Sequence, residues 1–267
     1  MPAVNVKSVL ITGTTSGLGR GLLEYYVKNG VRVIAVNRRR VAELESQYPS
    51  ARFECVDVRS AEDVDRLVRG LAASGQLPEV FILNAGINRT DNDESFELSA
   101  YREVMDTNLY GVVNFVQPLT QLPACPIERH VIAISSMASY AGNPYGLGYH
   151  TSKKALTACF DVWSTMYAET DLVFQQVMLG PVRTGIYTMA DHFPSWMVRI
   201  RDLFSASLAG TVRAISGLAL TRKKKLHYPW RALLLYGATR ICRCLVPGFF
   251  RGRKTLAGNA RRSRAGQ

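Results

Sequence analysis

Short runs of apolar residues alternate along the chain with longer segments in which apolar residues recur every three or four positions. The short runs have the length of buried β-strands, and the longer segments have the spacing of amphipathic helices. Strands are expected over residues 6–12, 31–36, 53–58, 80–83, 131–134 and 172–179. Helices are expected between them over 17–29, 41–47, 61–71, 99–121 and 149–169.

Six strands that alternate with helices predict a parallel sheet covered by helices on both faces. Because crossover connections between parallel strands are right-handed, few topologies remain for such a chain. We therefore expect an α/β protein with a single-domain Rossmann fold, a doubly wound parallel sheet of six to seven strands. With 267 residues, of which 47% are hydrophobic and 20% charged, the chain suffices for one large domain.

The net charge of +12 is concentrated at one end of the chain. Of the 33 Lys and Arg residues, 13 lie in residues 221–267, where there is no Asp or Glu. The first 220 residues therefore carry 20 basic against 21 acidic side chains, a balance of −1. We expect a neutral domain over 1–220, a basic, apolar and aromatic C-terminal extension over 221–256, and a disordered tail over 257–267.

The five cysteines are odd in number and include no CxxC pair, which predicts reduced thiols rather than disulfides or structural zinc. None of the four histidines has the spacing of a metal site, so no metal is expected. The segment Met1–Ile11 has one Lys and a short apolar run, unlike a secretory signal. These features together predict a cytoplasmic protein.

A glycine-rich turn, Thr12-Gly13-Thr14-Thr15-Ser16-Gly17-Leu18-Gly19, joins the first strand to the first helix. Glycines let a backbone approach an anion closely, and the N–H groups at a helix N-terminus attract its charge. By itself such a turn can be purely structural, but its position favours a dinucleotide pyrophosphate site. The residues expected to contact the cofactor here are Gly13, Thr15, Ser16, Gly17, Leu18 and Gly19.

The end of the second strand predicts which dinucleotide binds. An NAD site places an acid here, whereas this chain has Asn37 followed by Arg38, Arg39 and Arg40. Guanidinium groups can bind a 2′-phosphate bidentately, so we expect NADP(H), held by Asn37, Arg38 and Arg20. Arg39 and Arg40 can instead form a solvated start to the next helix.

The pair Asp57 and Val58 follows the third strand and is expected beside the adenine, where Asp57 can accept a hydrogen bond from the amino group.

Tyr149 and Lys153 open a predicted helix at a spacing of four residues, which places them on one face. Further motifs occur along the chain in a fixed order: Asn84-Ala85-Gly86, Asn108, Ser136 and Gly180-Pro181-Val182-x-Thr184. In these motifs and their distances the chain resembles the short-chain dehydrogenase/reductase family, closely over residues 6–184. Gly180 and Pro181 stand in the reverse of the order that many members have.

The resemblance implies four catalytic residues. Tyr149 would be the general acid/base, because the ammonium of Lys153 lowers the pKa of its phenol. Lys153 would also hold the ribose of the nicotinamide. Ser136 would position the substrate carbonyl, whereas Ser135 should point to the other face of the strand. Asn108 would hold a water in a proton relay to Lys153, unless it is a locally bonded helix residue.

The same resemblance assigns further cofactor contacts. The turn Asn84-Ala85-Gly86 would face the cofactor, and Pro181, Val182 and Thr184 would close over the nicotinamide. His150, beside Tyr149, is expected to lie on the helix surface rather than to act as a base.

The family resemblance also implies a substrate lid at about residues 185–210. Its apolar residues Trp196, Ile200, Leu203 and Phe204 share one helix face, which either packs on the domain or lines a pocket for an apolar substrate. The extension over 230–246 contains three Arg, too many for a spanning helix, and suits an interfacial helix on anionic lipid. The alternative is that it packs on the domain or on a second subunit. Nucleic acid is not expected as a partner.

These features predict an NADP(H)-dependent oxidoreductase that interconverts a carbonyl and an alcohol on a hydrophobic substrate. We expect a homo-oligomer, a dimer or tetramer that associates through the long helices, in the cytoplasm and in peripheral contact with a membrane through the extension. Two alternatives stay open: a non-catalytic NADP(H)-sensing regulator, and an epimerase or dehydratase that acts on a nucleotide sugar.

Overall fold

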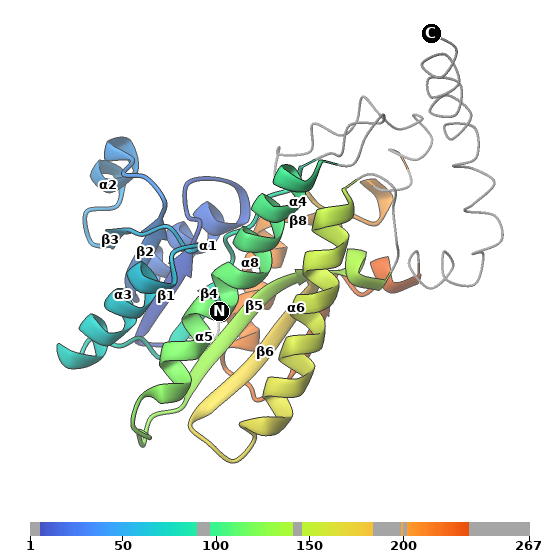
Figure 1. Cartoon of the computed structure of the whole chain (residues 1–267). Helices are drawn as coiled ribbons and strands as arrows, with labels where there is room; N and C mark the ends of the chain where they lie inside the picture. Colours follow the sequence, from blue (N-terminus) through green and yellow to red (C-terminus); the bar gives the residue numbers. More distant parts are fainter. Residues whose placement is uncertain (1–5, 90–96, 141–145, 184–198, 200–201, 235–267) are drawn as a thin grey trace, which may run out of the picture.

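The computed structural model describes residues 6–89, 97–140, 146–183, 199 and 202–234 (Figure 1). Seven strands form one sheet in the order β3-β2-β1-β4-β5-β6-β9, and every neighbouring pair is parallel. The order reverses direction at β1, so the expected doubly wound fold is confirmed. The strands are β1 (Ser8–Thr12), β2 (Arg32–Asn37), β3 (Arg52–Cys55), β4 (Val80–Leu83), β5 (Arg129–Ser136), β6 (Leu172–Leu179) and β9 (Lys225–Tyr228).

Helices cover both faces of this sheet (Figure 1). On one face α3 packs beside α5, and α4 beside α6; on the other, α1 packs beside α8. The helices are α1 (Gly17–Lys28), α2 (Ala42–Gln47), α3 (Ala61–Ala73), α4 (Leu98–Met105), α5 (Gly111–Gln121), α6 (Leu147–Met166) and α8 (Leu208–Leu218).

The strand β1 shows how the sequence pattern produces these layers. All five of its residues are buried, as expected for a central parallel strand. Val9 and Ile11 point into the core under α1 and α8, whereas Leu10 points into the core under α3, α5 and α6. Because side chains alternate along a strand, one apolar run supplies both cores.

The long helical segment expected over 99–121 contains one π-helical turn. The α-helix α4 ends at Met105, a π-helical turn η1 runs over Asp106–Tyr110, and α5 begins at Gly111. The expected helical segment is therefore present, but hydrophobic spacing did not reveal the one-residue widening of this turn. Such π-turns are frequent at functional sites, and this one carries the buried Asn108.

The sheet continues beyond Leu220, the expected end of the domain. Residues 225–228 form the edge strand β9, which pairs with β6 from Gln176 to Leu179. The first part of the basic extension therefore belongs to the fold, because its main chain completes the hydrogen bonds of β6. The rest of the extension, from residue 235, and the tail over 257–267 lie outside the described residues.

The expected lid falls mostly outside the described residues. The two short strands β7 (Val182–Arg183) and β8 (Ala206–Ser207) flank it and pair with each other. Of the four apolar lid residues, the structure describes Leu203 and Phe204 but not Trp196 or Ile200. Among the described residues, no helix has the length and apolar character that crossing a membrane requires.

Candidate active site

The glycine-rich turn after β1 is built for close backbone approach. Gly13 and Gly17 have positive φ angles of 71° and 55°, which residues with a side chain rarely adopt. A Cβ on Gly19 would overlap the carbonyl oxygen of Gly13 and lie 2.7 Å from Asn84 Nδ2. Helix α1 can therefore begin directly against the turn only because residue 19 has no side chain.

Hydrogen bonds join this turn to the end of β4. The Thr12 hydroxyl oxygen accepts from the backbone N–H groups of Asn84 and Ala85, each at 2.9 Å. In return, Asn84 Nδ2 donates to the carbonyl oxygens of Thr12 and Gly13, at 3.0 and 3.1 Å. The turn Asn84-Ala85-Gly86 therefore lies beside the glycine-rich turn, and the Asn84 amide fixes the two together.

The side chain of Asn37 has a structural task that the sequence did not reveal. It is buried, its Oδ1 accepts from the Thr14 N–H at 2.8 Å, and its Nδ2 donates to Thr14 Oγ1 at 2.9 Å. Asn37 therefore holds the shape of the glycine-rich turn from the end of β2. Thr14 was not among the predicted site residues, because its role depends on a partner 23 positions away.

The turn and the helix that follows it fit a dinucleotide pyrophosphate. Thr15 and Ser16 are exposed at the N-terminus of α1, and the Ser16 side chain does not cap the helix. The N–H groups of the first helical turn thus receive no cap from Ser16, and they lie beside a cradle that a Cβ would fill. These residues would hold the phosphates of a nicotinamide dinucleotide.

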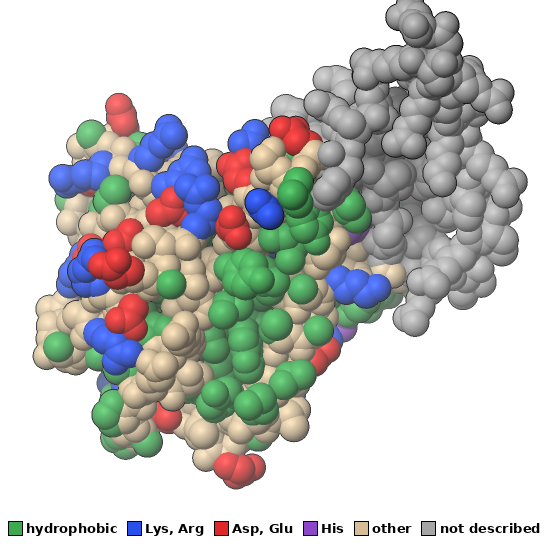
Figure 2. Space-filling model, in the orientation of Figure 1, with side chains coloured by type: hydrophobic (Ala, Val, Ile, Leu, Met, Phe, Trp, Pro, Cys, Tyr) green, Lys and Arg blue, Asp and Glu red, His purple; other side chains and the backbone are tan. Residues whose placement is uncertain are grey.

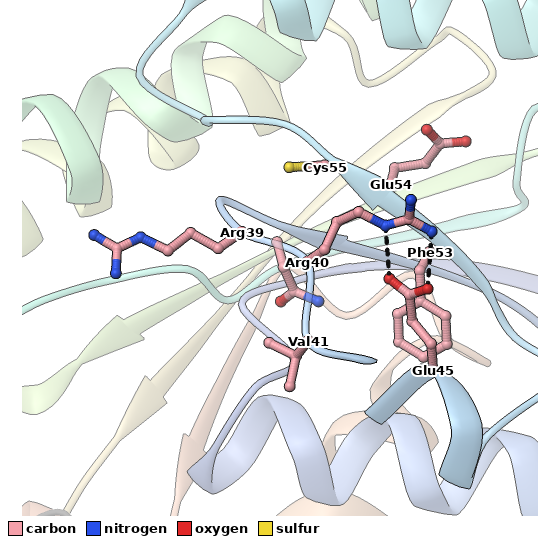
Figure 3. Close-up of a pocket in the computed structure, with 8 residues that line it drawn as sticks. Arg39, Arg40, Val41, Glu45, Phe53, Glu54 and Cys55 are labelled. Carbon is pink, nitrogen blue, oxygen red and sulfur yellow. Dashed lines mark hydrogen bonds and ion pairs between the residues drawn. The ribbon is translucent and has the colours of Figure 1, made fainter. Parts of the chain in front are cut away.

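Of the arginines expected at the 2′-phosphate or beside it, some bind other side chains and some do not. Arg40 forms an ion pair with Glu45 at 3.0 Å, and Figure 3 shows the Arg39 side chain extending away from that pair. Arg20 donates to Gln47 Oε1 at 2.6 Å. Arg38 is exposed and forms no ion pair with a described residue.

Asp57, expected at the adenine, is held by its neighbour Arg59. Arg59 Nε lies 3.0 Å from both carboxylate oxygens, and hydrogen bonds from Arg59 lower the pKa of Asp57. The carboxylate is half-buried and ionised, and it already accepts from a guanidinium.

Val58 is buried, and its carbonyl oxygen accepts from Asn114 Nδ2 at 2.8 Å. Asn114 of α5 thus holds the main chain at Val58, and it was not among the predicted site residues.

Tyr149 and Lys153 lie on one face of α6, as their spacing predicts. Lys153 Nζ is 5.8 Å from the centre of the Tyr149 ring and donates to the carbonyl oxygen of Ile134 at 2.7 Å. The side chain of Lys153 is only 5% exposed. Because burial disfavours the charged form, the pKa of Lys153 falls from 10.5 to about 8.

The two serines at the end of β5 point in different directions, as strand alternation requires. Ser135 Oγ lies 3.0 Å from Thr157 Oγ1, on the side of α6. Ser136 Oγ accepts from the Ala138 N–H at 3.1 Å and donates to the carbonyl oxygen of Leu179 at 3.3 Å. The hydroxyl of Ser136 therefore lies between the carboxyl ends of β5 and β6.

The side chain of Asn108 is used within the protein. Its Oδ1 accepts from the Ile87 N–H at 2.8 Å, and its Nδ2 donates to the Ile87 carbonyl oxygen at 2.9 Å and to Ser152 Oγ at 3.1 Å. Asn108 thus ties the loop after β4 to α6, one residue before Lys153. A Cβ on Gly86 would lie 3.2 Å from Asn108 Oδ1 and 3.7 Å from Lys153 Nζ, so this loop passes close to both.

His150 departs from the expectation of a surface residue. It is half-buried, and its Nδ1 lies 2.9 Å from the carbonyl oxygen of Ala138. The prediction was wrong because helical spacing places a residue on a face without showing that another segment covers that face.

The segment after β6 is packed against the chain beyond β9. A Cβ on Gly180 would lie 2.6 Å from the Cβ of Ala232 and 3.3 Å from Pro229 Cδ. Pro181 and Val182 are buried directly after it. Thr184, expected at the nicotinamide, lies outside the described residues.

Candidate metal ligands do not cluster in the described part of the chain: it contains no group of three His, Cys, Asp or Glu side chains that could hold an ion.

The chain is similar to short-chain dehydrogenases and reductases over most of its length. The model of the short chain dehydrogenase family matches residues 7–193. Dehydrogenase/reductase SDR family member 7B of Bos taurus is 29% identical over 275 residues, covering 96% of this chain and 82% of that protein. An NADPH-dependent pterin aldehyde reductase of Arabidopsis thaliana is 30% identical over 161 residues, covering 57% of this chain and 66% of that protein.

A solved structure shows the same fold. The crystal structure of a short-chain dehydrogenase from Streptomyces avermitilis superposes with a TM-score of 0.73 at 20% identity, covering 95% of this chain and 99% of that one. The fold and the dinucleotide cradle define an α/β dinucleotide-binding protein, and the family match makes it an oxidoreductase. The chain belongs to the short-chain dehydrogenase/reductase family.

Proposed function

We propose that this protein is an NADP(H)-dependent oxidoreductase that interconverts a carbonyl and an alcohol on a hydrophobic small molecule. The observation that carries the proposal is the position of Lys153. Its buried Nζ lies 5.8 Å from the Tyr149 ring, on the helix that faces the end of β5, where Ser136 lies. This arrangement can bind a carbonyl oxygen and give it a proton.

In the proposed reaction, Ser136, Tyr149 and Lys153 together bind the carbonyl oxygen and supply its proton. A bound nicotinamide supplies or accepts the hydride. Ser136, whose hydroxyl would exchange the Leu179 carbonyl for the substrate, and Tyr149 would bind the carbonyl oxygen. Tyr149 would donate the proton as the alkoxide develops. With a pKa of about 8, Lys153 is mostly protonated at pH 7, so its charge favours the phenolate that Tyr149 becomes. Asn108, whose side chain binds Ile87 and Ser152, would hold the relay water, as the family resemblance implies.

The preference for NADP(H) rests on the residues after β2. No acid stands at the position that would repel a 2′-phosphate, and Arg38 is exposed there. Arg20, which donates to Gln47, would contact the same 2′-phosphate after exchanging that bond. Among the relatives, the Arabidopsis thaliana reductase is NADPH-dependent. An NADPH preference favours reduction in the cell, because that pool is kept reduced.

A hydrophobic surface supports assembly into a homo-oligomer. Figure 2 shows hydrophobic side chains gathered over α5 and α6. Large apolar residues of α6 and η1 are among the exposed ones: Tyr110, Leu147, Val162 and Met166 are 47–66% exposed. Association through these helices would remove this surface from water.

The extension is proposed to contact an anionic membrane surface. Arg222, Lys223 and Lys224 are exposed before β9, and Trp230 and Leu234 after it are 66% and 62% exposed. Basic and large apolar side chains together suit the head-group boundary of a bilayer. Residence in the cytoplasm stays a prediction.

Substitution of Tyr149 tests the proposed function. Tyr149→Phe should lower the rate of NADPH oxidation with an apolar ketone or aldehyde by a factor on the order of 10² to 10⁴, because it removes the general acid. The dissociation constant for NADPH should change little. Tyr110→Phe, which removes an exposed hydroxyl from η1, is the matched control. Turnover by Tyr149→Phe at the rate of the unchanged protein would refute the mechanism.

The two alternatives predict other results in the same assay. A regulator that only senses NADP(H) would bind NADPH and reduce no compound of an apolar carbonyl panel. An epimerase or dehydratase would convert a nucleotide sugar without net NADPH consumption.

A further inference from the structure

A short 3₁₀ turn directly follows Ser136, and we name it the serine turn. It comprises Met137–Tyr140. Its residues Met137, Ala138 and Ser139 are buried. The backbone N–H of Ala138 donates to Ser136 Oγ at 3.1 Å, so the position of the turn determines where this hydroxyl is held.

His150 binds the serine turn from the helix that carries Tyr149. Its Nδ1 lies 2.9 Å from the carbonyl oxygen of Ala138. A carbonyl oxygen can only accept, so His150 Nδ1 carries the hydrogen. The His150 ring also meets the Tyr149 ring edge to face, with centres 6.1 Å apart. Ala138 therefore links His150 to Ser136: its carbonyl oxygen accepts from His150, and its N–H donates to the Ser136 hydroxyl.

His227 binds the same turn from the edge strand β9. Its Nε2 lies 2.7 Å from the Tyr140 hydroxyl, and the two rings stack at 5.9 Å with an angle of 24°. Burial and then the charges of Lys225 and Lys223 lower the pKa of His227. Burial and then the charge of Asp161 raise the pKa of Tyr140. Both groups are therefore neutral at pH 7, and their bond persists across the neutral range.

Apolar contacts hold the turn from the same side as β9. Met137 packs with Met178 of β6 and with Ala232, and Tyr140 and Leu233 are packed against these three. The residues after β9 thus cover the serine turn, although they lie about 90 positions away in sequence.

We propose that His150 and His227 are positioning residues, which together hold the serine turn so that the Ser136 hydroxyl stays aligned with the Tyr149 phenol. This inference rests on the proposed function, since it concerns the alignment of its two proton-bearing groups. The hydrogen bonds of the two histidines go to the serine turn and not to the Ser136 hydroxyl itself. A displacement of about 1 Å at a reacting centre can lower a rate on the order of 10²-fold, so two bonds to one turn can matter greatly.

Paired variants test the proposal. His150→Leu and His227→Leu remove the bonds, whereas His150→Asn and His227→Gln each keep a nitrogen at the position of the bonding ring nitrogen. Tyr140→Phe removes the bond to His227 with the least change of shape. We expect each Leu variant and Tyr140→Phe to lower kcat for carbonyl reduction by roughly 10-fold or more. The Asn and Gln variants should recover most of kcat.

Two further readouts separate positioning from mere stability. Poor alignment slows proton transfer, so the solvent deuterium isotope effect on kcat should rise in the variants that lose a bond, while the dissociation constant for NADPH stays within about twofold. A smaller folded fraction would lower the apparent kcat and leave the isotope effect unchanged, which would overturn the proposal. Equal impairment of the Leu variants and of the Asn and Gln variants would also overturn it.

Tyr149→Phe is measured beside these variants. If it turns over like the unchanged protein, the proposed function itself fails, and this inference fails with it. If it is inactive while the Leu variants and Tyr140→Phe keep the kcat and isotope effect of the unchanged protein, only the positioning role of the histidines is overturned.

Discussion

Lys153 donates a hydrogen bond to the carbonyl oxygen of Ile134, 2.7 Å away, from a side chain that is almost fully buried. One neutral acceptor compensates an ammonium only in part, which is why the pKa of Lys153 falls to about 8. The folded protein without cofactor thus holds a charged group at the expense of stability. Active sites commonly accept such a penalty, because the charge is needed for binding and catalysis.

Lys153→Met should therefore stabilise the cofactor-free protein at neutral pH while abolishing turnover. The pKa of Lys153 is about 8 in the folded protein and 10.5 as its ordinary value. Between pH 8 and pH 10.5 the unfolded chain therefore binds more protons than the folded protein does. The loss of folding stability caused by the buried ammonium is fully present below pH 8 and disappears as the pH rises towards 10.5. Each pKa unit corresponds to about 1.4 kcal/mol, so the gain at pH 7 should be on the order of 3 kcal/mol.

Urea unfolding of Lys153→Met and of the unchanged protein at pH 7 and pH 10 checks this prediction. The difference in free energy of unfolding should shrink at the higher pH. A difference that is equal at both values would show that the buried ammonium does not destabilise the fold.

Arg38→Asp should shift the cofactor preference towards NADH. It replaces an exposed cation after β2 with an anion that repels a 2′-phosphate and can accept from a ribose hydroxyl. We expect KM for NADPH to rise about 10-fold or more and KM for NADH to change less or to fall. Arg32→Asp is the control, because this exposed arginine lies at the other end of β2. Equal effects of the two substitutions on NADPH would argue against a phosphate contact at Arg38.

Gly180→Ala should destabilise the protein, because its Cβ would lie 2.6 Å from the Cβ of Ala232. Overpacking of this kind costs about 1–3 kcal/mol. Ala232→Gly in the same chain removes the overlap, so the double variant should be more stable than Gly180→Ala alone. Thermal unfolding of the two single variants and the double variant measures this coupling. Purely additive effects would show that the two residues do not contact each other in solution.

Removal of residues 235–267 should weaken binding to anionic liposomes, although Arg222, Lys223, Lys224 and Trp230 remain exposed. The removed residues hold eight of the 13 basic side chains of residues 221–267, and attraction to lipid phosphates weakens as salt increases. The cut after Leu234 keeps β9 and so leaves the sheet intact. Sedimentation with anionic and with neutral vesicles measures binding. Unaltered partitioning would favour packing of the extension on the domain or on a second subunit.

The sequence predicted the fold and the elements that carry the site well. Six of the seven strands were expected near their observed positions, because each is an apolar run bounded by turn residues. The strand β9 was missed. Its residues Lys225–Tyr228 follow three basic residues and include a Lys and a His, so they do not have the pattern of a buried strand. They form a strand because the exposed edge of β6 offers main-chain partners.

Several contacts within the site could not be predicted from motifs. The spacing of Tyr149 and Lys153 placed them on one face of a helix, but the bond from Lys153 to Ile134 joins α6 to β5. Likewise, Asn37 was expected at the cofactor, whereas its amide binds Thr14. A local pattern reports on neighbours within about two helical turns, and these partners lie farther along the chain.

By itself, the sequence determined the alternation of strands and helices, the glycines of the dinucleotide turn and the face that Tyr149 and Lys153 share, because hydrophobic spacing and backbone sterics act locally. Only the tertiary structure decided the burial of Lys153, the attachment of β9 to the sheet and the convergence of His150 and His227 on the turn after Ser136. Burial and long-range hydrogen bonds depend on which segments meet, and that is determined when the whole chain packs around its cores.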